Sequence, residues 1–71
     1  MELSRATEGT LTLALSEQEL CVIHACLQES LTVIHPWEYR HMVGVPVETA
    51  SGIAGRLHHL MRVIGIVDGH V

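Results

Sequence analysis

The sequence predicts a mainly α-helical fold: a small three-helix domain with short flanking β-strands, in the order strand, helix, helix, helix, strand. Two observations lead to this prediction. Ser16 and Glu19 form an S-x-x-E helix start signal, and an apolar stripe of about four helical turns follows it. Pro36, Gly44 and Pro46 then divide the remaining chain at spacings that suit two further helices.

The N-terminal part contains one strand pattern. Residues 1–9 mix charge, threonine and glycine without a period, which indicates a flexible arm ahead of a single small helical domain at residues 10–71. From Thr10 to Leu15 (TLTLAL) leucine alternates with threonine or alanine, as in a half-buried strand. The other strand candidate is the β-branched run Val63 to Val67 (VIGIV), which the turn signal Asp68-Gly69 follows. These two strands are candidates to pair antiparallel, within the chain or across a dimer.

The first helix is predicted from Ser16 to Leu31. The Ser16 hydroxyl and the Glu19 carboxylate can each accept a hydrogen bond from a free backbone N–H of the first turn. Four apolar residues fall on one side of this helix: Leu20, Ile23, Leu27 and Leu31. We expect that face to be buried. The helix should end near His35, because the residue before a proline is disfavoured in the α region.

A second, short helix is predicted over Trp37 to Val43. Pro36 suits its first position, and Gly44 suits a left-handed cap at its end. The side chains expected to face the core are either Trp37, or Tyr39 with Met42 and Val43.

Pro46 opens a third helix that runs to about Arg62. Its apolar stripe comprises Val47, Ala50, Ile53 or Ala54, Leu57, Leu60 or Met61, and Ile64. Gly52 and Gly55 together cost about 2 kcal/mol of helix propensity, so either this helix start is weak or another helix packs closely against it. That neighbour is the first helix or a second copy of this one. Replacing both glycines by alanine is then expected to lower stability through overpacking.

Composition and charge limit the classes of function. The chain has no Lys and four Arg against eight acidic residues, a net charge of −4, so nucleic acid is an unfavoured partner. Six histidines could reverse the sign of the charge in mild acid. No run reaches the length of a membrane span and none has the pattern of a signal peptide, so we expect neither membrane insertion nor secretion, and two unpaired cysteines, Cys21 and Cys26, suit a reducing cytoplasm. Hydrophobic residues make up 48% of so short a chain, which favours burial of surplus apolar surface in a homodimer.

Catalytic and metal-binding patterns are weak. The candidate ligands are Cys21, His24, Cys26, His35, His41, His58, His59 and His70. Their spacings lack a C-x-x-C pair, so we expect no metal site. A second candidate is a nucleophilic Cys21 activated by His24 or by a histidine of the third helix, but buried structural cysteines are commoner and an orienting acid is lacking. We therefore expect a protein that is not an enzyme and has no cofactor.

The stretch from Tyr39 to Leu60 resembles a helix-turn-helix, with Gly44 in the turn. The resemblance implies a DNA-binding regulator in which Thr49, Ser51 and Arg56 face the DNA. The chain departs from that pattern at Arg40, where a small residue is usual. Its second helix offers only Arg56 as a basic side chain to contact DNA.

Residues 11–57 carry a broader resemblance, through LTLALSEQEL, ACLQESL and WEYRHMVGVPVETA. These segments are similar to a group of small uncharacterised bacterial helical proteins found especially in actinobacteria and cyanobacteria. Gln28-Glu29 stands for the Asn-Glu of that group and Glu38-Tyr39 for its Glu-Phe, whereas His41 and Met42 depart from its Thr-Arg pair. The resemblance implies no known activity.

The function expected from the sequence is a small non-enzymatic module for protein–protein interaction, regulatory or accessory in kind, homodimeric and cytoplasmic, with an unidentified protein partner. The residues expected at its interface are Trp37, Tyr39, Ser51, Gly52, Gly55 and Met61. The alternative is the helix-turn-helix DNA-binding transcriptional regulator.

Overall fold

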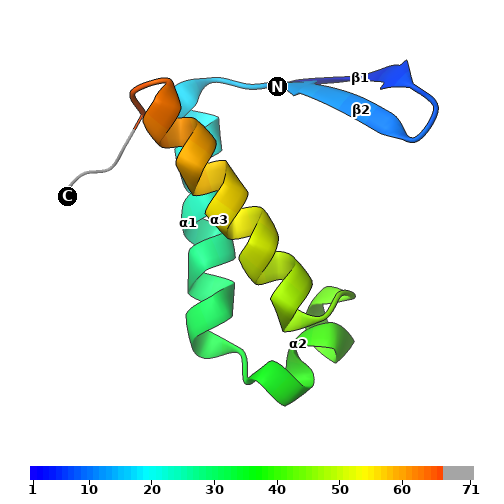
Figure 1. Ribbon diagram of the computed structural model, residues 1–71, viewed down its shortest axis with the longest axis vertical. Coiled ribbons are helices and arrows are strands. Elements are labelled where there is room, and N and C mark those ends of the chain that lie inside the picture. Colours follow the sequence, from blue (N-terminus) through cyan, green and yellow to red (C-terminus); the bar gives the residue numbers. More distant parts are fainter. Residues whose placement is uncertain (67–71) are drawn as a thin grey trace.

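The computed structural model describes residues 1–66. The elements are β1 (Glu2–Thr7), β2 (Thr10–Ala14), α1 (Glu17–Val33), α2 (Pro36–Val43) and α3 (Val47–Val63). Helices α1 and α3 lie side by side and run in opposite directions, and α2 lies at one end of the pair (Figure 1). The hairpin of β1 and β2 extends away from the other end (Figure 1). The predicted mainly helical fold with three helices is confirmed.

The N-terminal hairpin differs from the flexible arm expected for residues 1–9. Residues 2–7 form β1, which pairs antiparallel with β2, and the turn between them contains Gly9 at φ 86°. Leu3 lies opposite Leu13 in the register. β2 covers the predicted strand, but its partner is this upstream segment rather than the Val63 to Val67 run. Every residue of both strands is exposed.

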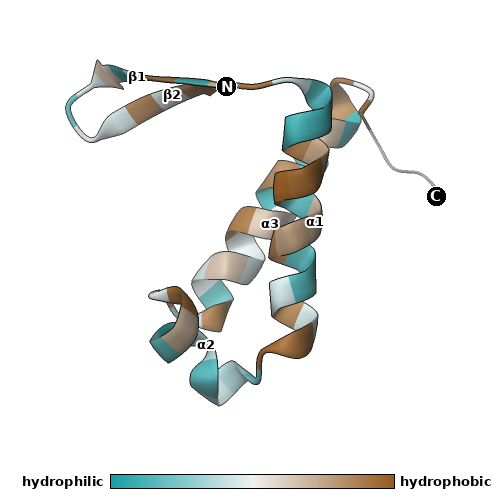
Figure 2. Cartoon of the chain, turned by 180° about the vertical axis from the view of Figure 1, so that it is seen from behind, coloured by the Kyte–Doolittle hydropathy of each residue, from teal (hydrophilic) through white to brown (hydrophobic). Residues whose placement is uncertain are grey.

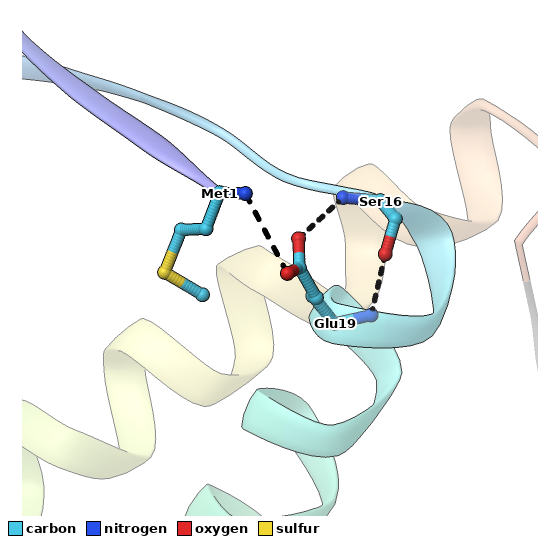
Figure 3. Close-up of polar contacts among 3 residues, drawn as sticks. All are labelled: Met1, Ser16 and Glu19. Atoms are coloured by element: carbon cyan, nitrogen blue, oxygen red, sulfur yellow. Dashed lines mark hydrogen bonds and ion pairs between the residues drawn. The ribbon is translucent and has the colours of Figure 1, made fainter.

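The start of α1 is the predicted capping box. The Glu19 N–H donates to the Ser16 Oγ at 3.0 Å, and the Ser16 N–H donates to the Glu19 Oε1 at 2.8 Å (Figure 3). The other oxygen of the Glu19 carboxylate lies 3.6 Å from the ammonium group of Met1, at the base of the hairpin (Figure 3). Because both groups of that ion pair are well exposed, it adds little stability. The capping box is the contact that sets where α1 begins.

Proline and glycine set the limits of α2. Ile34 leaves the helical region after α1, and Pro36 takes the first position of α2 behind an extended His35. Gly44 ends α2 at φ 99°, in the left-handed region that glycine occupies without strain, and its N–H donates to the Arg40 carbonyl at 2.9 Å. Both predicted boundaries are confirmed.

The end of α3 shows why no strand starts at Val63. Val63 is the last helical residue, and Gly65 turns the chain at φ 84°. The Gly65 N–H donates to the Arg62 carbonyl at 3.1 Å and the Ile66 N–H to the Met61 carbonyl at 2.8 Å, which is the Schellman pattern of a helix end. The predicted strand is therefore wrong for residues 63–66, and its last residue, with the Asp68-Gly69 turn, lies outside the described residues.

The core is small and lies between α1, α2 and α3. Its buried apolar residues in the described chain are Tyr39, Ala50, Ala54 and Met61. Three of them, Ala50, Ala54 and Met61, come from one face of α3. The apolar stripe of α1 is less buried than expected. Leu20, Leu27 and Leu31 are only half-buried, and Ile23 is 39% exposed. The reason is that α3 is the main neighbour of α1 and covers one side of it.

Candidate interaction surface

Apolar side chains are exposed on every element of the described chain. Fourteen large ones are exposed: Met1, Leu3, Leu11, Leu13, Val22, Ile23, Val33, Trp37, Met42, Val43, Ile53, Leu60, Val63 and Ile64. Single exposed hydrophobic residues are normal on a protein surface, but here they far outnumber the buried ones. This surface is the feature of the molecule that needs a functional explanation.

The hairpin contributes the first part of this surface. The register pairs Leu3 with Leu13 and Arg5 with Leu11, so these four side chains lie on one face. Leu3, Leu11 and Leu13 are 65%, 54% and 44% exposed. Figure 2 shows apolar residues, in brown, alternating with polar ones along β2. We call this set of three leucines the leucine face of the hairpin.

The outer side of α3 contributes the second part. A shallow groove of about 390 Å³ lies over Gly52, Gly55, Arg56, His59 and Leu60. All five residues belong to one helix, so the groove is open and has no opposite wall within the described chain. The helix positions place this groove on the side of α3 opposite Ala50 and Ala54, which face the core.

The glycines of α3 are not packed as the sequence suggested. A Cβ on Gly55 would have no atom within 4 Å, and one on Gly52 would meet only the end of the flexible Arg56 side chain at 3.9 Å. The first helix therefore does not rest on Gly52 and Gly55, and that part of the expectation is wrong. The small side chains that α3 buries are those of Ala50 and Ala54.

The expected effect of the double variant Gly52→Ala/Gly55→Ala on stability therefore changes from a loss to a gain. Within one chain the two methyl groups have free space, so the free energy of unfolding should rise by up to about 2 kcal/mol, the gain in helix propensity. Urea melts at two protein concentrations measure this change. A loss of stability would contradict the prediction and would indicate that a helix of a second copy packs on the glycines.

The interface residues predicted from the sequence fall into two groups. Trp37 is 78% exposed, and Ser51, Gly52 and Gly55 are exposed on α3, so all four are available to a partner. Tyr39 and Met61 are buried, at 0% and 6% exposure, and this part of the prediction is corrected. Tyr39 faces inward because its hydroxyl finds a polar partner there: Ser30 donates to the Leu27 carbonyl at 2.7 Å and so accepts from Tyr39 at 2.6 Å.

The candidate DNA-reading residues are all exposed, but they do not form one face. Thr49 and Arg56 are seven positions apart on α3 and share a side of the helix. Ser51 lies about 160° around the axis from Thr49. Residues that read base edges must enter one groove together, so this arrangement does not form a reading surface.

The histidines and cysteines considered as metal ligands or as a nucleophile with its base are dispersed over the described chain. His24 of α1 and His58 of α3 stack with ring centroids 5.6 Å apart, a contact that the sequence did not predict. Cys21 and Cys26 are free and exposed, which differs from the buried structural cysteines that the sequence favoured. Within residues 1–66, no three side chains of His, Cys, Asp or Glu come together as a metal site would require.

The hairpin face is the part of the surface that sequence reasoning missed. Of the three leucines on this face, the sequence predicts a strand for Leu11 and Leu13 but a flexible arm for Leu3. Gly9, four residues after Arg5 and directly before the TLTLA strand, is the one signal that could have indicated a turn into a preceding strand.

Comparison of the sequence with protein-family models, with curated proteins and with solved structures finds no match. The resemblances to a helix-turn-helix and to a bacterial protein group therefore stay predictions. No helix among residues 1–66 has the length and apolar character needed to cross a lipid bilayer.

Proposed function

We propose that this chain is a small module for protein–protein interaction, of a regulatory or accessory kind, that works as a homodimer. The observation that carries the proposal is the set of fourteen exposed large hydrophobic side chains, including the leucine face of a hairpin with all positions exposed. A two-stranded hairpin is at best marginally stable in water, so its leucines need cover that the described chain does not provide.

The surface area supports a dimer quantitatively. The chain exposes 5440 Å², whereas a compact monomer of its mass, 7.8 kDa, exposes about 4,400 Å². Residues 67–71 contribute at most about 700 Å² of this area, the accessible area of a fully extended segment of their mass. Without them, the chain still exposes about 500 Å² more than a compact chain of the remaining length. The excess of about 500–1,000 Å² per chain matches the roughly 800 Å² that each partner buries in a standard interface.

Charge and thiol chemistry support a protein partner in the cytoplasm. The net charge is −4, and duplex DNA needs a basic face to replace its counterions. The two exposed free thiols, Cys21 and Cys26, suit a reducing compartment. We expect no binding of random duplex DNA at low salt. Binding that falls steeply as salt is raised would favour the helix-turn-helix regulator instead.

Sedimentation velocity over a wide range of protein concentrations tests the homodimer. We expect a sedimenting species of twice the chain mass that dissociates on dilution, together with a melting temperature that rises with protein concentration. A species of single chain mass at every concentration, with a melting temperature independent of concentration, would refute the homodimer.

A further inference from the structure

The two outer edges of the hairpin differ in how well they are protected against another strand. In the described residues the sheet has two strands, so the backbone groups on the outer edge of each are unpaired. β1 carries Glu2 and Arg5 and has an irregularity in its pairing between Arg5 and Thr7. Charges and bulges of this kind are the devices that block edge-to-edge association.

β2 has none of these devices. Its five residues, Thr10–Ala14 (TLTLA), contain no charge and no proline, and their register with β1 is regular from Leu11 to Ala14. Threonine is β-branched and favours strands. An uncharged edge without proline or bulge is the kind that accepts a further strand.

We propose that β2 of one chain pairs antiparallel with β2 of a second copy, on a twofold axis at Thr12, to form a continuous four-stranded sheet. This inference rests on the proposed homodimer and states where its contact lies. The order of strands across the sheet is β1, β2, then β2 and β1 of the second copy.

The register follows from the side-chain pattern. With Thr12 opposite Thr12 of the partner subunit, Leu11 lies opposite Leu13 of the partner subunit, and Thr10 opposite Ala14 of the partner subunit. All five residues are then paired, and each leucine faces a leucine. A shift of one position would place leucines opposite threonines and put the two leucine faces on opposite sides of the sheet. A larger shift leaves residues of this short strand unpaired.

The pairing removes the marginal stability of the two-stranded hairpin, while the leucine faces of the two chains come to lie side by side on one face of the sheet. Three or more strands with an apolar face are needed for an independently stable sheet, and the dimer supplies four. The leucine faces of the two hairpins become one continuous surface of six leucines.

Cross-linking at the twofold axis tests the register. In a background with Cys21 and Cys26 replaced by serine, Thr12→Cys places two thiols on directly opposite residues, whose Cα atoms are about 4.5–5.5 Å apart. That spacing suits a disulfide. We expect mild oxidation with diamide to convert most of this variant to a covalent dimer on a non-reducing gel.

Ser4→Cys in the same background is the matched control. Ser4 lies opposite Thr12 within the hairpin, on the same face and also exposed, but on β1. In the four-stranded sheet its thiol is separated from its copy by three strand spacings, about 14 Å, and should not cross-link. Equal cross-linking of the two variants, or none at Thr12→Cys, would overturn the inference.

A charge at the axis gives an independent test without oxidation. Thr12→Lys puts two like charges directly opposite each other, so the dimer dissociation constant should rise about threefold or more. Ser4→Lys, which carries the same charge on β1, should leave the dissociation constant unchanged. An equal effect of both variants would contradict the twofold axis at Thr12.

Sedimentation of the serine background separates the two proposals. If the background protein is a dimer, but Thr12→Cys does not cross-link and Thr12→Lys leaves the dissociation constant unchanged, the homodimer is retained and the β2 contact is refuted. A background protein that stays monomeric would refute both.

Discussion

Tyr39→Ala is expected to lower the free energy of unfolding by about 3–5 kcal/mol, the range for removing a buried aromatic ring. Tyr39 is 0% exposed, and it is the largest fully buried side chain of the described residues. Its loss also removes the hydroxyl that contacts Ser30 at 2.6 Å and so joins α2 to α1. For a domain of this size such a loss is enough to leave a large unfolded population at room temperature. Urea denaturation followed by circular dichroism measures it.

Trp37→Ala is the matched control, because it removes an even larger ring two positions earlier on the same helix. Trp37 is 78% exposed, and its ring stacks only on His35 at 5.7 Å in the described chain. We expect a change within about 0.5 kcal/mol, as for a surface substitution. If Trp37→Ala proved the more damaging variant, the orientation of α2 would be wrong. Tyr39→Phe should cost about 1 kcal/mol and isolates the hydroxyl contact.

Met61→Ala carries the second large expected effect, a loss of about 2–5 kcal/mol. Met61 is 6% exposed and lies in the last turns of α3, on the face that packs against α1. Its removal leaves a cavity on the buried face of α3. The expected result is a urea midpoint well below that of the parent chain with little change in the slope of the transition.

Met42→Ala is the control for this prediction, because it removes the same side chain from a helix position that is 64% exposed. Its effect should stay within about 0.5 kcal/mol. Similar losses at both methionines would show that α3 packs against α1 through a different face.

Local chemistry made the helix boundaries predictable. The capping box of Ser16 and Glu19, the first-turn Pro36 and the left-handed Gly44 each act through neighbours within four residues in the sequence. Such contacts form wherever the segment sits in the molecule. For this reason the starts and ends of α1, α2 and α3 agree with the structure to within two residues.

The errors have a different origin. β-branched residues at positions 63 and 64 indicated a strand, but Gly65 turns the chain, and the N–H groups of Gly65 and Ile66 then cap the Arg62 and Met61 carbonyls at the end of α3. The partner of β2 was missed because β1 has one leucine and no clear alternation, so only the pairing reveals it as a strand. Trp37 and Tyr39 were equally good candidates for the core. Packing selected Tyr39, whose hydroxyl reaches Ser30.

The candidate surface depends even more on tertiary structure. The sequence indicated surplus apolar residues and a homodimer, and it singled out Gly52 and Gly55. Which apolar residues are exposed depends on how many helices pack against each helix face, and no local sequence pattern specifies that number. The half-buried stripe of α1 and the open glycines of α3 follow from a single helix pair with α2 at one end.

By itself, the sequence determined the helical class, the helix limits and the excess of apolar side chains. Caps and prolines act on residues within a few positions of them in the sequence, and composition does not depend on the fold at all. Only the tertiary structure decided that Ala50, Ala54, Tyr39 and Met61 form the buried core of the described residues, and that the hairpin stands apart with its leucine face uncovered. These outcomes depend on contacts between segments far apart in the chain. Their free energies come from burial and shape at each contact, which no single stretch of sequence contains.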